Sequence, residues 1–581
     1  MVVPAFPRGA DSRFVQWGFA PSEVIGRPFH WLLDLNLGGQ VIRLSDQELD
    51  VTLTDKVGDA HTWRYYGGLE FDEQVEDPVA LLSDMPDSRS ISMTLHLSPQ
   101  WKISEFVEQG VVLGSATGVL RFWPEGSTRA MTVLVGMFRD PTFDTDDTPL
   151  IGTLEEDPSN DRSLYPSQDA RVMLGDPYSR WGATWGSPVK GVIGEYYPDI
   201  FGSPGQQDPQ IAGSPALVVH DATVFPAVAW WLVAGHPVIA TSVRIINASQ
   251  ENYQVMPVYQ ERDGLGRLVS VAKWSLPLPI GWGVDDDYWA EWEVSTATPV
   301  RQYGMYADDV SLPEGRRGAG DILQYVLRQS GLRWDEGRVA ALTQRLNGFR
   351  LDTYLMADAD NRISPWEWIQ DALLPILPIS PRIGPGGLHF VFWDYTAVAD
   401  DAIASIVCVE GVVGGAAANA VRVSEVETTP IDDVVHTWDI SYMVDADTGD
   451  PGAVFTMSGD PAVLDSGGEG IIPDLHLIRG VQAYEQPVSE TFTIDTVRDH
   501  ATATVIGQWK ARSQAVQYYE VSYLVDAEIA VGLEAGDVVT ITDEGRGWSS
   551  KPCLVDLVVW SARKMWEVGL RIPAHDIGSA G

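Results

Sequence analysis

Hydrophobic and polar residues alternate through much of the first 140 positions of the chain. In segments 31–37 and 91–97 every second residue is hydrophobic, with mostly polar residues between. A period of two predicts β-strands with one buried face. Two further apolar segments, 119–123 and 131–138, flank the polar turn 124–127 and predict a hairpin. We therefore expect residues 1–150 to form an N-terminal β domain, as a sandwich or barrel.

The next part of the chain, residues 151–310, is predicted to be a loop-rich β region. From 141 to about 213 the composition shifts to Asp, Pro, Gly and Ser, which favours loops. Strands are expected near 238–246 and 268–274. The stretch 222–243 carries no charge, but Pro and Gly interrupt it, so we predict no membrane anchor.

Residues 311–400 have the apolar spacing of helices and are predicted to be a small helical insertion. Asp321 is expected to cap a first helix and Asp335 a second. Ser364, Pro365 and Glu367 form a capping box with proline at the first helical position, which predicts a third.

Strand patterns return in residues 401–581, the predicted C-terminal β-barrel domain with one helix. A strand at 436–444 is expected to turn back into 454–457. The helix is predicted near 496–513, with one face made by Val497, Ala501, Val505 and Trp509. Three closing strands are expected at 538–541, 554–560 and 566–572. The predicted fold class is mainly β (α+β): two β-barrel or sandwich-like regions separated by a small helical insertion.

The charge is strongly acidic, with 39 Lys and Arg against 81 Asp and Glu and a net charge of −42. Nucleic-acid affinity comes chiefly from Lys and Arg that neutralise phosphates, so a broad DNA-binding face is not expected. An acidic wall could still let DNA slide past without sticking. Solubility or a saline habitat would explain the same acidity.

The two cysteines, Cys408 and Cys553, are far apart and have no Cys or His at metal-ligand spacing. A disulfide framework and a zinc or iron-sulfur site are therefore not expected. The N-terminus has no basic region followed by an apolar stretch, so we expect synthesis and assembly in the cytoplasm.

Catalytic motifs are absent from the sequence, including the G-x-S-x-G, H-E-x-x-H and Walker patterns. The best carboxylate pair is Glu291 and Glu293 around Trp292, because alternate residues of a strand share a face about 7 Å apart. An exposed strand of an acidic protein is the alternative. We predict no enzymatic activity and no catalytic residues.

Two acidic loops resemble calcium-binding turns, since hard cations prefer several oxygen ligands. One holds Asp445, Asp447 and Asp450; the other holds Asp358 and Asp360. Asp and Gly are also the ordinary residues of turns. Neither loop completes an EF-hand, so we predict no cofactor and no metal, with calcium at 445–450 left open.

Tryptophan is abundant, with 22 residues, and it is enriched both in interface cores and on carbohydrate platforms. The densest clusters are 181–185, 230–231 and 366–368. Core packing would explain most of them, and subunit contacts some of the rest.

Three passages resemble the baseplate-hub, or tail-tip, family of long-tailed bacteriophages and gene-transfer particles. They are 190–197 with 215–219, the helical insert from Gly320 to Leu388, and the terminal barrel from Leu533 to Ile572. The resemblance implies a homotrimer whose paired barrel-like domains form a pseudo-sixfold ring between the hexameric tail tube and the threefold tip. No appended muramidase or peptidase domain is seen.

The predicted function is therefore that of a structural virion protein: a hub ring that closes or continues the tail tube. Expected partners are further copies of the chain, distal tail ring and tail tube proteins, tip fibre or receptor-binding proteins, and DNA passing without specific binding. The alternatives are a carbohydrate-binding or glycan-degrading tail protein, in which Glu291 and Glu293 would act on sugar, and a distal-tail ring protein.

Overall fold

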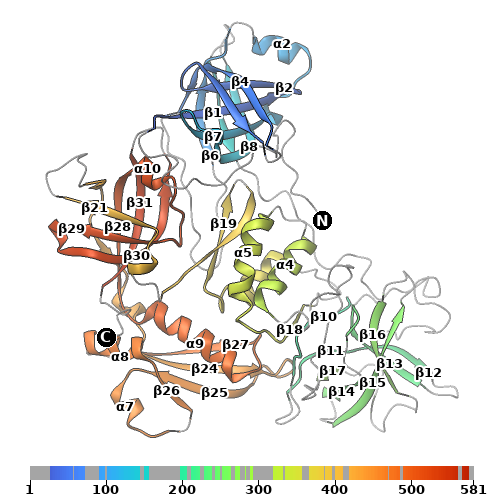
Figure 1. Cartoon of the computed structure of the whole chain (residues 1–581). Coiled ribbons are helices and arrows are strands. Elements are labelled where there is room, and N and C mark those ends of the chain that lie inside the picture. The colour runs from blue at the N-terminus through green and yellow to red at the C-terminus, as the bar shows by residue number, and fades with distance from the viewer. Residues whose placement is uncertain are drawn as a thin grey trace.

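The fold is seen in a computed structural model of the whole chain (Figure 1). The structure describes residues 27–55, 58–71, 90–98, 101–143, 149–155, 196–205, 211–222, 228–238, 242–248, 252–262, 268–274, 282, 288–291, 318–330, 334–355, 365–384, 386–395, 399–409, 418–468, 470–484, 488–560 and 565–574. Strands predominate, which confirms the mainly β prediction.

The N-terminal domain is a nine-stranded sheet in the order β3-β4-β2-β1-β7-β8-β9-β6-β5. The strands are β1 (Phe29–Leu37), β2 (Gln40–Ser45), β3 (Leu49–Thr54), β4 (Ala60–Gly67), β5 (Leu69–Glu70), β6 (Ser90–Leu95), β7 (Thr117–Pro124), β8 (Met131–Phe143) and β9 (Leu150–Glu155). A short helix, α2 (Ile103–Glu108), accompanies them. The predicted strands and the β7–β8 hairpin are confirmed.

Gly68 closes this sheet into a barrel. It joins β4, which pairs with β2, to β5, which pairs with β6. Its N–H donates to the Ser45 carbonyl at 3.0 Å, and its carbonyl accepts from the His96 N–H at 2.7 Å. Its φ of 142° is accessible to glycine, and a Cβ there would lie 2.3 Å from the His96 oxygen. These two hydrogen bonds bring β2 and the end of β6 together across Gly68, so the sheet curls into a barrel.

The expectation of loops from residue 141 is wrong at β9. Leu150, Gly152 and Leu154 share the face of β9 that points into the barrel, and both leucines are fully buried. The run is only six residues long, so its period is hard to distinguish within a Pro- and Asp-rich sequence.

The middle region contains a seven-stranded sheet in the order β11-β17-β14-β15-β16-β13-β12. Its strands are β11 (Ser214–Pro215), β12 (Leu217–Ala222), β13 (Val228–Ala234), β14 (Ser242–Asn247), β15 (Asn252–Arg262), β16 (Leu268–Trp274) and β17 (Tyr288–Glu291). The expected strands near 238–246 and 268–274 are present. A small pair, β10 (Asp199–Phe201) with β18 (Thr353–Leu355), connects this region to the insertion.

The insertion holds α4 (Ala319–Ser330), α5 (Glu336–Leu346), α6 (Pro365–Trp368), a π-helical turn (Ile369–Leu373) and the hairpin β19 (Ile379–Gly384) and β20 (Gly387–Phe392). Asp335 caps α5 as predicted, accepting from the Arg338 N–H. Asp321 does not cap α4: the helix begins at Ala319, and the Asp321 carboxylate accepts from Asn347. Ser364 lies outside the described residues.

The C-terminal domain is a barrel in the order β21-β29-β30-β31-β28-β22. Its strands are β21 (Ala404–Cys408), β22 (Ala420–Arg422), β28 (Tyr518–Asp526), β29 (Val538–Asp543), β30 (Trp548–Val559) and β31 (Met565–Pro573). The short strand β23 (Glu427–Thr428) also pairs with β28, and the short helix α10 (Ala527–Ala530) directly follows β28 in the chain. Asn419 links the two ends of the sheet, because its side chain accepts from the Val407 N–H and donates to the Ser405 carbonyl.

Between β23 and β28 the chain forms a second unit, a four-stranded sheet in the order β26-β25-β24-β27. Its elements are β24 (Thr437–Val444), β25 (Pro451–Ser458), α7 (Pro461–Leu464), β26 (Ile471–Pro473), α8 (Leu475–Tyr484), β27 (Ser489–Ile494) and α9 (His500–Gln514). The predicted 436–444 to 454–457 hairpin is confirmed. Figure 1 shows α9 lying along this sheet.

The predicted buried face of α9 is wrong. Asp499 caps the helix by accepting from the Thr502 N–H, so the helix begins after Val497, and Val505 is 43 % exposed. The small residues Ala503, Gly507 and Ala511 are buried instead. Ile506 is fully buried on the same face. A Cβ at Gly507 would lie 2.3 Å from Ile440, so the helix and the sheet approach each other closely at this glycine.

Candidate functional site

Four aromatic residues join the interiors of the two barrels, and we call them the barrel junction: Phe29, Trp31, Phe122 and Trp566. The first three come from the N-terminal barrel and Trp566 from β31 of the C-terminal barrel. The Trp566 ring centroid lies 6.5 Å from Phe29, 6.3 Å from Trp31 and 5.4 Å from Phe122. Trp31, Phe122 and Trp566 are almost fully buried.

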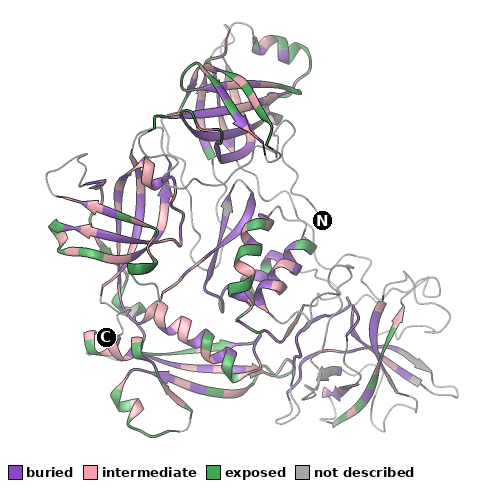
Figure 2. Cartoon of the chain, in the orientation of Figure 1, coloured by how far each residue is buried: buried purple, intermediate pink, exposed green. Residues whose placement is uncertain are grey.

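One hydrophobic core therefore runs through the junction from one barrel into the other. Figure 2 shows buried positions along the strands of both barrels. The pattern of the sequence predicted inward-facing Trp31 and Trp566, but each within its own domain. Trp31 and Trp566 are more than 500 positions apart in the chain, and their contact couples the two barrels.

A second contact holds the C-terminal barrel against the insertion, and we call it the turn clamp: Arg338, Arg382, Glu534 and Asp537. The Arg338 guanidinium donates two hydrogen bonds to Glu534, at 2.7 and 2.6 Å. Arg382 is 1 % exposed, and burial lowers its pKa to about 10, although Glu534 and Asp537 oppose the shift. Burial raises the pKa of Asp537 to about 6.

The turn between these two carboxylates fits closely on β20. Gly536 has a φ of +86°, and a Cβ there would lie 2.4 Å from Val391. The predicted entering turn of the barrel thus exists, and it also docks the barrel on the insertion. This second role requires the two arginines, which sequence reasoning did not connect with the turn.

Within the C-terminal barrel, Asp543 is a buried ionic centre. It accepts hydrogen bonds from Arg422 and from the Tyr523 hydroxyl, the latter at 2.8 Å. Burial alone would raise the pKa of Asp543, but the hydrogen bonds from Arg422 and Tyr523 bring it below its usual value. A satisfied, ionised carboxylate of this kind stabilises the barrel and has no proton to offer for catalysis at neutral pH.

The acidic loop that resembled a calcium site is a hydrogen-bonded turn. Asp445 accepts from the backbone N–H groups of Asp447 at 2.9 Å, Thr448 at 3.0 Å and Ala212 at 2.7 Å. Among the described residues no group of three or more His, Cys, Asp or Glu side chains is placed to hold a metal ion. The loop connects the middle region to the four-stranded sheet.

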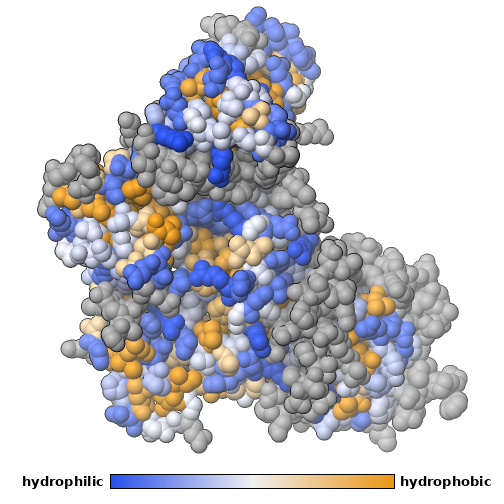
Figure 3. All heavy atoms as spheres, in the orientation of Figure 1, coloured by the Kyte–Doolittle hydropathy of each residue, from blue (hydrophilic) through white to orange (hydrophobic). Residues whose placement is uncertain are grey.

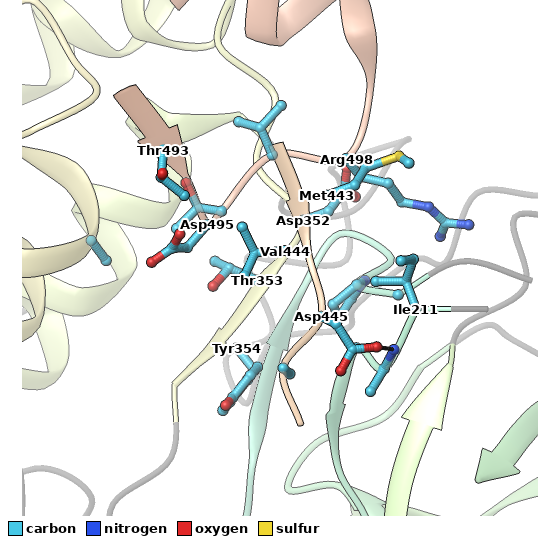
Figure 4. A pocket seen from close by; sticks show the side chains of 18 of the residues that line it. Ile211, Asp352, Thr353, Tyr354, Met443, Val444, Asp445, Thr493, Asp495 and Arg498 are labelled. Atoms are coloured by element: carbon cyan, nitrogen blue, oxygen red, sulfur yellow. Dashed lines mark hydrogen bonds between the residues drawn. The ribbon is translucent and has the colours of Figure 1, made fainter. Parts of the chain in front are cut away.

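This connection borders a cavity of about 480 Å³ (Figure 4). Its wall includes Asp352, Asp445 and Arg498. Asp352 accepts from the Ser203 N–H at 2.7 Å, and Arg498 donates to the Ser203 carbonyl, also at 2.7 Å. These polar side chains hold the backbone near residue 203 against the sheet, so they position one part of the chain on another.

Other predicted positions are only partly described. Glu291 ends β17, where its backbone lies opposite Arg244 of β14, and Glu293 is outside the described residues. The loop with Asp358 and Asp360 and the cluster at 181–185 also lie outside them. Cys408 and Cys553 are both buried and unbonded to each other, and burial raises the pKa of each thiol. Among the described helices none is long and apolar enough to cross a membrane.

Comparisons with known proteins give structural neighbours only. No family model matches the chain, and no curated protein does. Among solved structures, a tail protein from Neisseria meningitidis MC58 has a TM-score of 0.35 at 7 % identity, covering 94 % of this chain and 97 % of its own. A 43 kDa tail protein of prophage MuSo2 from Shewanella oneidensis has a TM-score of 0.34 at 7 % identity, covering 93 % and 98 %. A chain of a native gene transfer agent virion has a TM-score of 0.18 at 14 % identity, covering 46 % and 80 %.

Proposed function

We propose that this chain is a structural protein of the tail tip of a long-tailed phage or gene-transfer particle. In this role it forms a homotrimeric hub ring that closes or continues the tail tube and adapts its symmetry to the tip. Its neighbours would be the distal tail ring, the tube and the tip fibres or receptor-binding proteins. Assembly, rather than catalysis, is the proposed mechanism.

The observation that carries the proposal is the pair of closed barrels within one chain, coupled by the barrel junction. Three copies would supply six barrels around a threefold axis, which suits a hexameric tube on one side and a threefold tip on the other. The shared core around Trp566 would keep each pair of barrels at a constant angle. A flexible linker between them would not transmit a sixfold register.

The charge supports the same role. A net charge of −42 disfavours binding to phosphates and would let DNA pass a wall without sticking. The carboxylates that the structure describes in detail, Asp445 and Asp543, hold backbone and arginine groups in place. This use of acidic residues suits a scaffold.

Immunogold electron microscopy of particles from the source culture, with antibody against this chain, tests the proposal. Gold at one tail end is expected, and unlabelled particles with the antigen free in the lysate would overturn it. Quantitative mass spectrometry of purified particles then distinguishes a hub ring from a distal-tail ring by copy number. Three copies per particle are expected for a hub, whereas six would favour a distal-tail ring that keeps the symmetry of the tube.

A further inference from the structure

The cavity of about 480 Å³ between the insertion, the four-stranded sheet and the middle region has more acidic side chains in its wall than its own contacts use. Hydrophobic and hydrophilic residues are interspersed over the insertion and the four-stranded sheet in the space-filling view, so neither presents a uniform apolar face (Figure 3). The cavity is therefore the more specific feature, and its volume lies in the range of about 300–1,000 Å³ that small-ligand sites occupy.

Four carboxylates and one cation are among the described residues of the wall. The carboxylates are Asp352, Asp371, Asp445 and Asp495, and the cation is Arg498. Asp352, Asp445 and Arg498 hold backbone groups of the segments near residues 203 and 212. Asp371 and Asp495 are exposed, and neither makes a hydrogen bond or an ion pair with another described residue. These two carboxylates are therefore available to a ligand.

The two available carboxylates come from different elements. Asp371 lies in the π-helical turn Ile369–Leu373 of the insertion, and Asp495 directly follows β27. Figure 4 shows Asp445 bonded to the segment of Ile211, while Asp495 lies apart from it. Charges of one sign in the wall of a partly enclosed cavity attract a cation more strongly than the same charges on an open surface.

Much of the remaining wall is apolar and suits an aliphatic chain. It includes Trp368, Ile376 and Val497, which are 6 %, 4 % and 1 % exposed. Thr496 also belongs to the wall and is 5 % exposed, and its hydroxyl has no hydrogen-bond partner among the described residues. Buried hydroxyls are usually hydrogen-bonded, so this one leaves an acceptor at the cavity that an entering N–H donor would satisfy.

These features fit an alkyl guanidinium better than a metal ion or a neutral ligand. In the described part of the chain no group of three or more His, Cys, Asp or Glu side chains is placed to hold a metal ion. A neutral ligand would displace water from two carboxylates without compensating their charge. A guanidinium has five N–H donors in one plane, so it can serve two carboxylates on different elements while its aliphatic stem covers the apolar wall.

We infer that this cavity binds an arginine side chain presented by another protein, with the guanidinium between Asp371 and Asp495 and the stem against the wall around Trp368. A free amino acid carries its own carboxylate, which an acidic wall repels, whereas an arginine within a polypeptide brings only the positive charge. This inference goes beyond the proposed ring function and is independent of it.

The test is a ligand-observed NMR titration of the full chain with the blocked peptide acetyl-Ala-Arg-Ala-amide. We expect one saturable site per chain with a Kd of about 1 mM or lower, and binding weakened roughly tenfold in Asp371→Asn and in Asp495→Asn, since each loses a charge-assisted pair. The same peptide with citrulline, whose neutral urea has the shape of the guanidinium, should bind roughly tenfold or more weakly. The matched control is Asp400→Asn combined with Asp465→Asn, two exposed aspartates outside the cavity.

Each outcome decides the inference. A control that binds the peptide as weakly as the combined Asp371→Asn and Asp495→Asn variant would overturn it, because it would reveal a general attraction to an acidic surface. Equal binding of the citrulline peptide, or no saturable binding, would overturn it as well. Free arginine that binds as tightly as the blocked peptide would assign the cavity to an amino acid and overturn the protein-borne source.

Folding of the variants is checked separately. Circular dichroism identical to that of the unsubstituted chain establishes that each variant is folded. The comparison of the arginine and citrulline peptides uses only the unsubstituted chain, so it decides the inference even if a variant does not fold. None of these results bears on the position of the chain in the particle, so failure here leaves the ring proposal standing.

Discussion

Replacing Trp566 by alanine removes the side chain through which the two barrel interiors touch. Truncation of a buried tryptophan costs about 3–5 kcal/mol in lost burial and residual cavity. The near-perpendicular contact with Phe122, at 5.4 Å and 78°, contributes about 0.5–1.5 kcal/mol of this as a specific pair energy. Because Trp566 contacts both barrels, its loss is expected to split one cooperative thermal unfolding transition into two.

The assay is differential scanning calorimetry together with urea unfolding followed by far-ultraviolet circular dichroism. Trp548→Ala is the control, since Trp548 is half-buried in the same barrel and stacks on Tyr519 at 5.8 Å, away from the junction. We expect it to cost about 1 kcal/mol and to keep a single transition. A double-mutant cycle with Phe122→Ala measures the coupling across the junction.

A loss of less than about 1 kcal/mol in the free energy of unfolding of Trp566→Ala would refute the shared core, since losses that small are typical of substitutions at the surface. Zero coupling with Phe122→Ala, or two transitions already present in the unsubstituted chain, would refute it as well. Either result would also remove the main support for the ring proposal.

Further predictions concern the C-terminal barrel and its contacts. Burial raises the pKa of Asp556 to about 6, above its value in the unfolded chain. Between about pH 4 and 6 the folded state therefore binds more protons than the unfolded state, and the free energy of unfolding falls as the pH rises through this range. Asp556→Asn should raise the free energy of unfolding at pH 8 by up to about 3 kcal/mol and make the urea midpoint depend less on pH. Arg338→Ala breaks the bidentate pair with Glu534, and it should lower the free energy of unfolding by about 1 kcal/mol and speed proteolysis between the insertion and the barrel. The control is Arg345→Ala, which removes an exposed ion pair with Asp394, and equally fast proteolysis of the two variants would contradict the turn clamp. Asp445→Ala should lower stability by about 1–2 kcal/mol because three backbone N–H groups lose their acceptor, and calcium should not shift the melting temperature of the unsubstituted chain. A calcium-dependent rise that disappears in Asp445→Ala would show a metal site.

The spacing of hydrophobic residues along the chain was enough to predict strands and helices in segments that have a long and regular apolar face. The alternation around Trp31 and the last strands fits β1 and β31 because period two is a local property of an extended chain. Asp335 likewise caps α5 through an N–H only three residues away. These features depend on neighbours in sequence, so the sequence alone suffices for them.

Tertiary structure decided where those elements meet. Gly68 closes one barrel, Asn419 links the ends of the other, and Trp566 connects the two, each through contacts with residues distant in the chain. The buried face of α9 was mispredicted because the helix packs closely on the sheet at Gly507, and the pattern of large apolar residues does not reveal a contact made by a glycine. Asp445 has the residue type of a calcium ligand, and in the fold its oxygens accept from three backbone N–H groups, one of which lies 233 positions away. Strand pairing, barrel closure and the partner of each carboxylate depend on residues that are distant in the chain, and the local hydrophobic pattern carries no information about them.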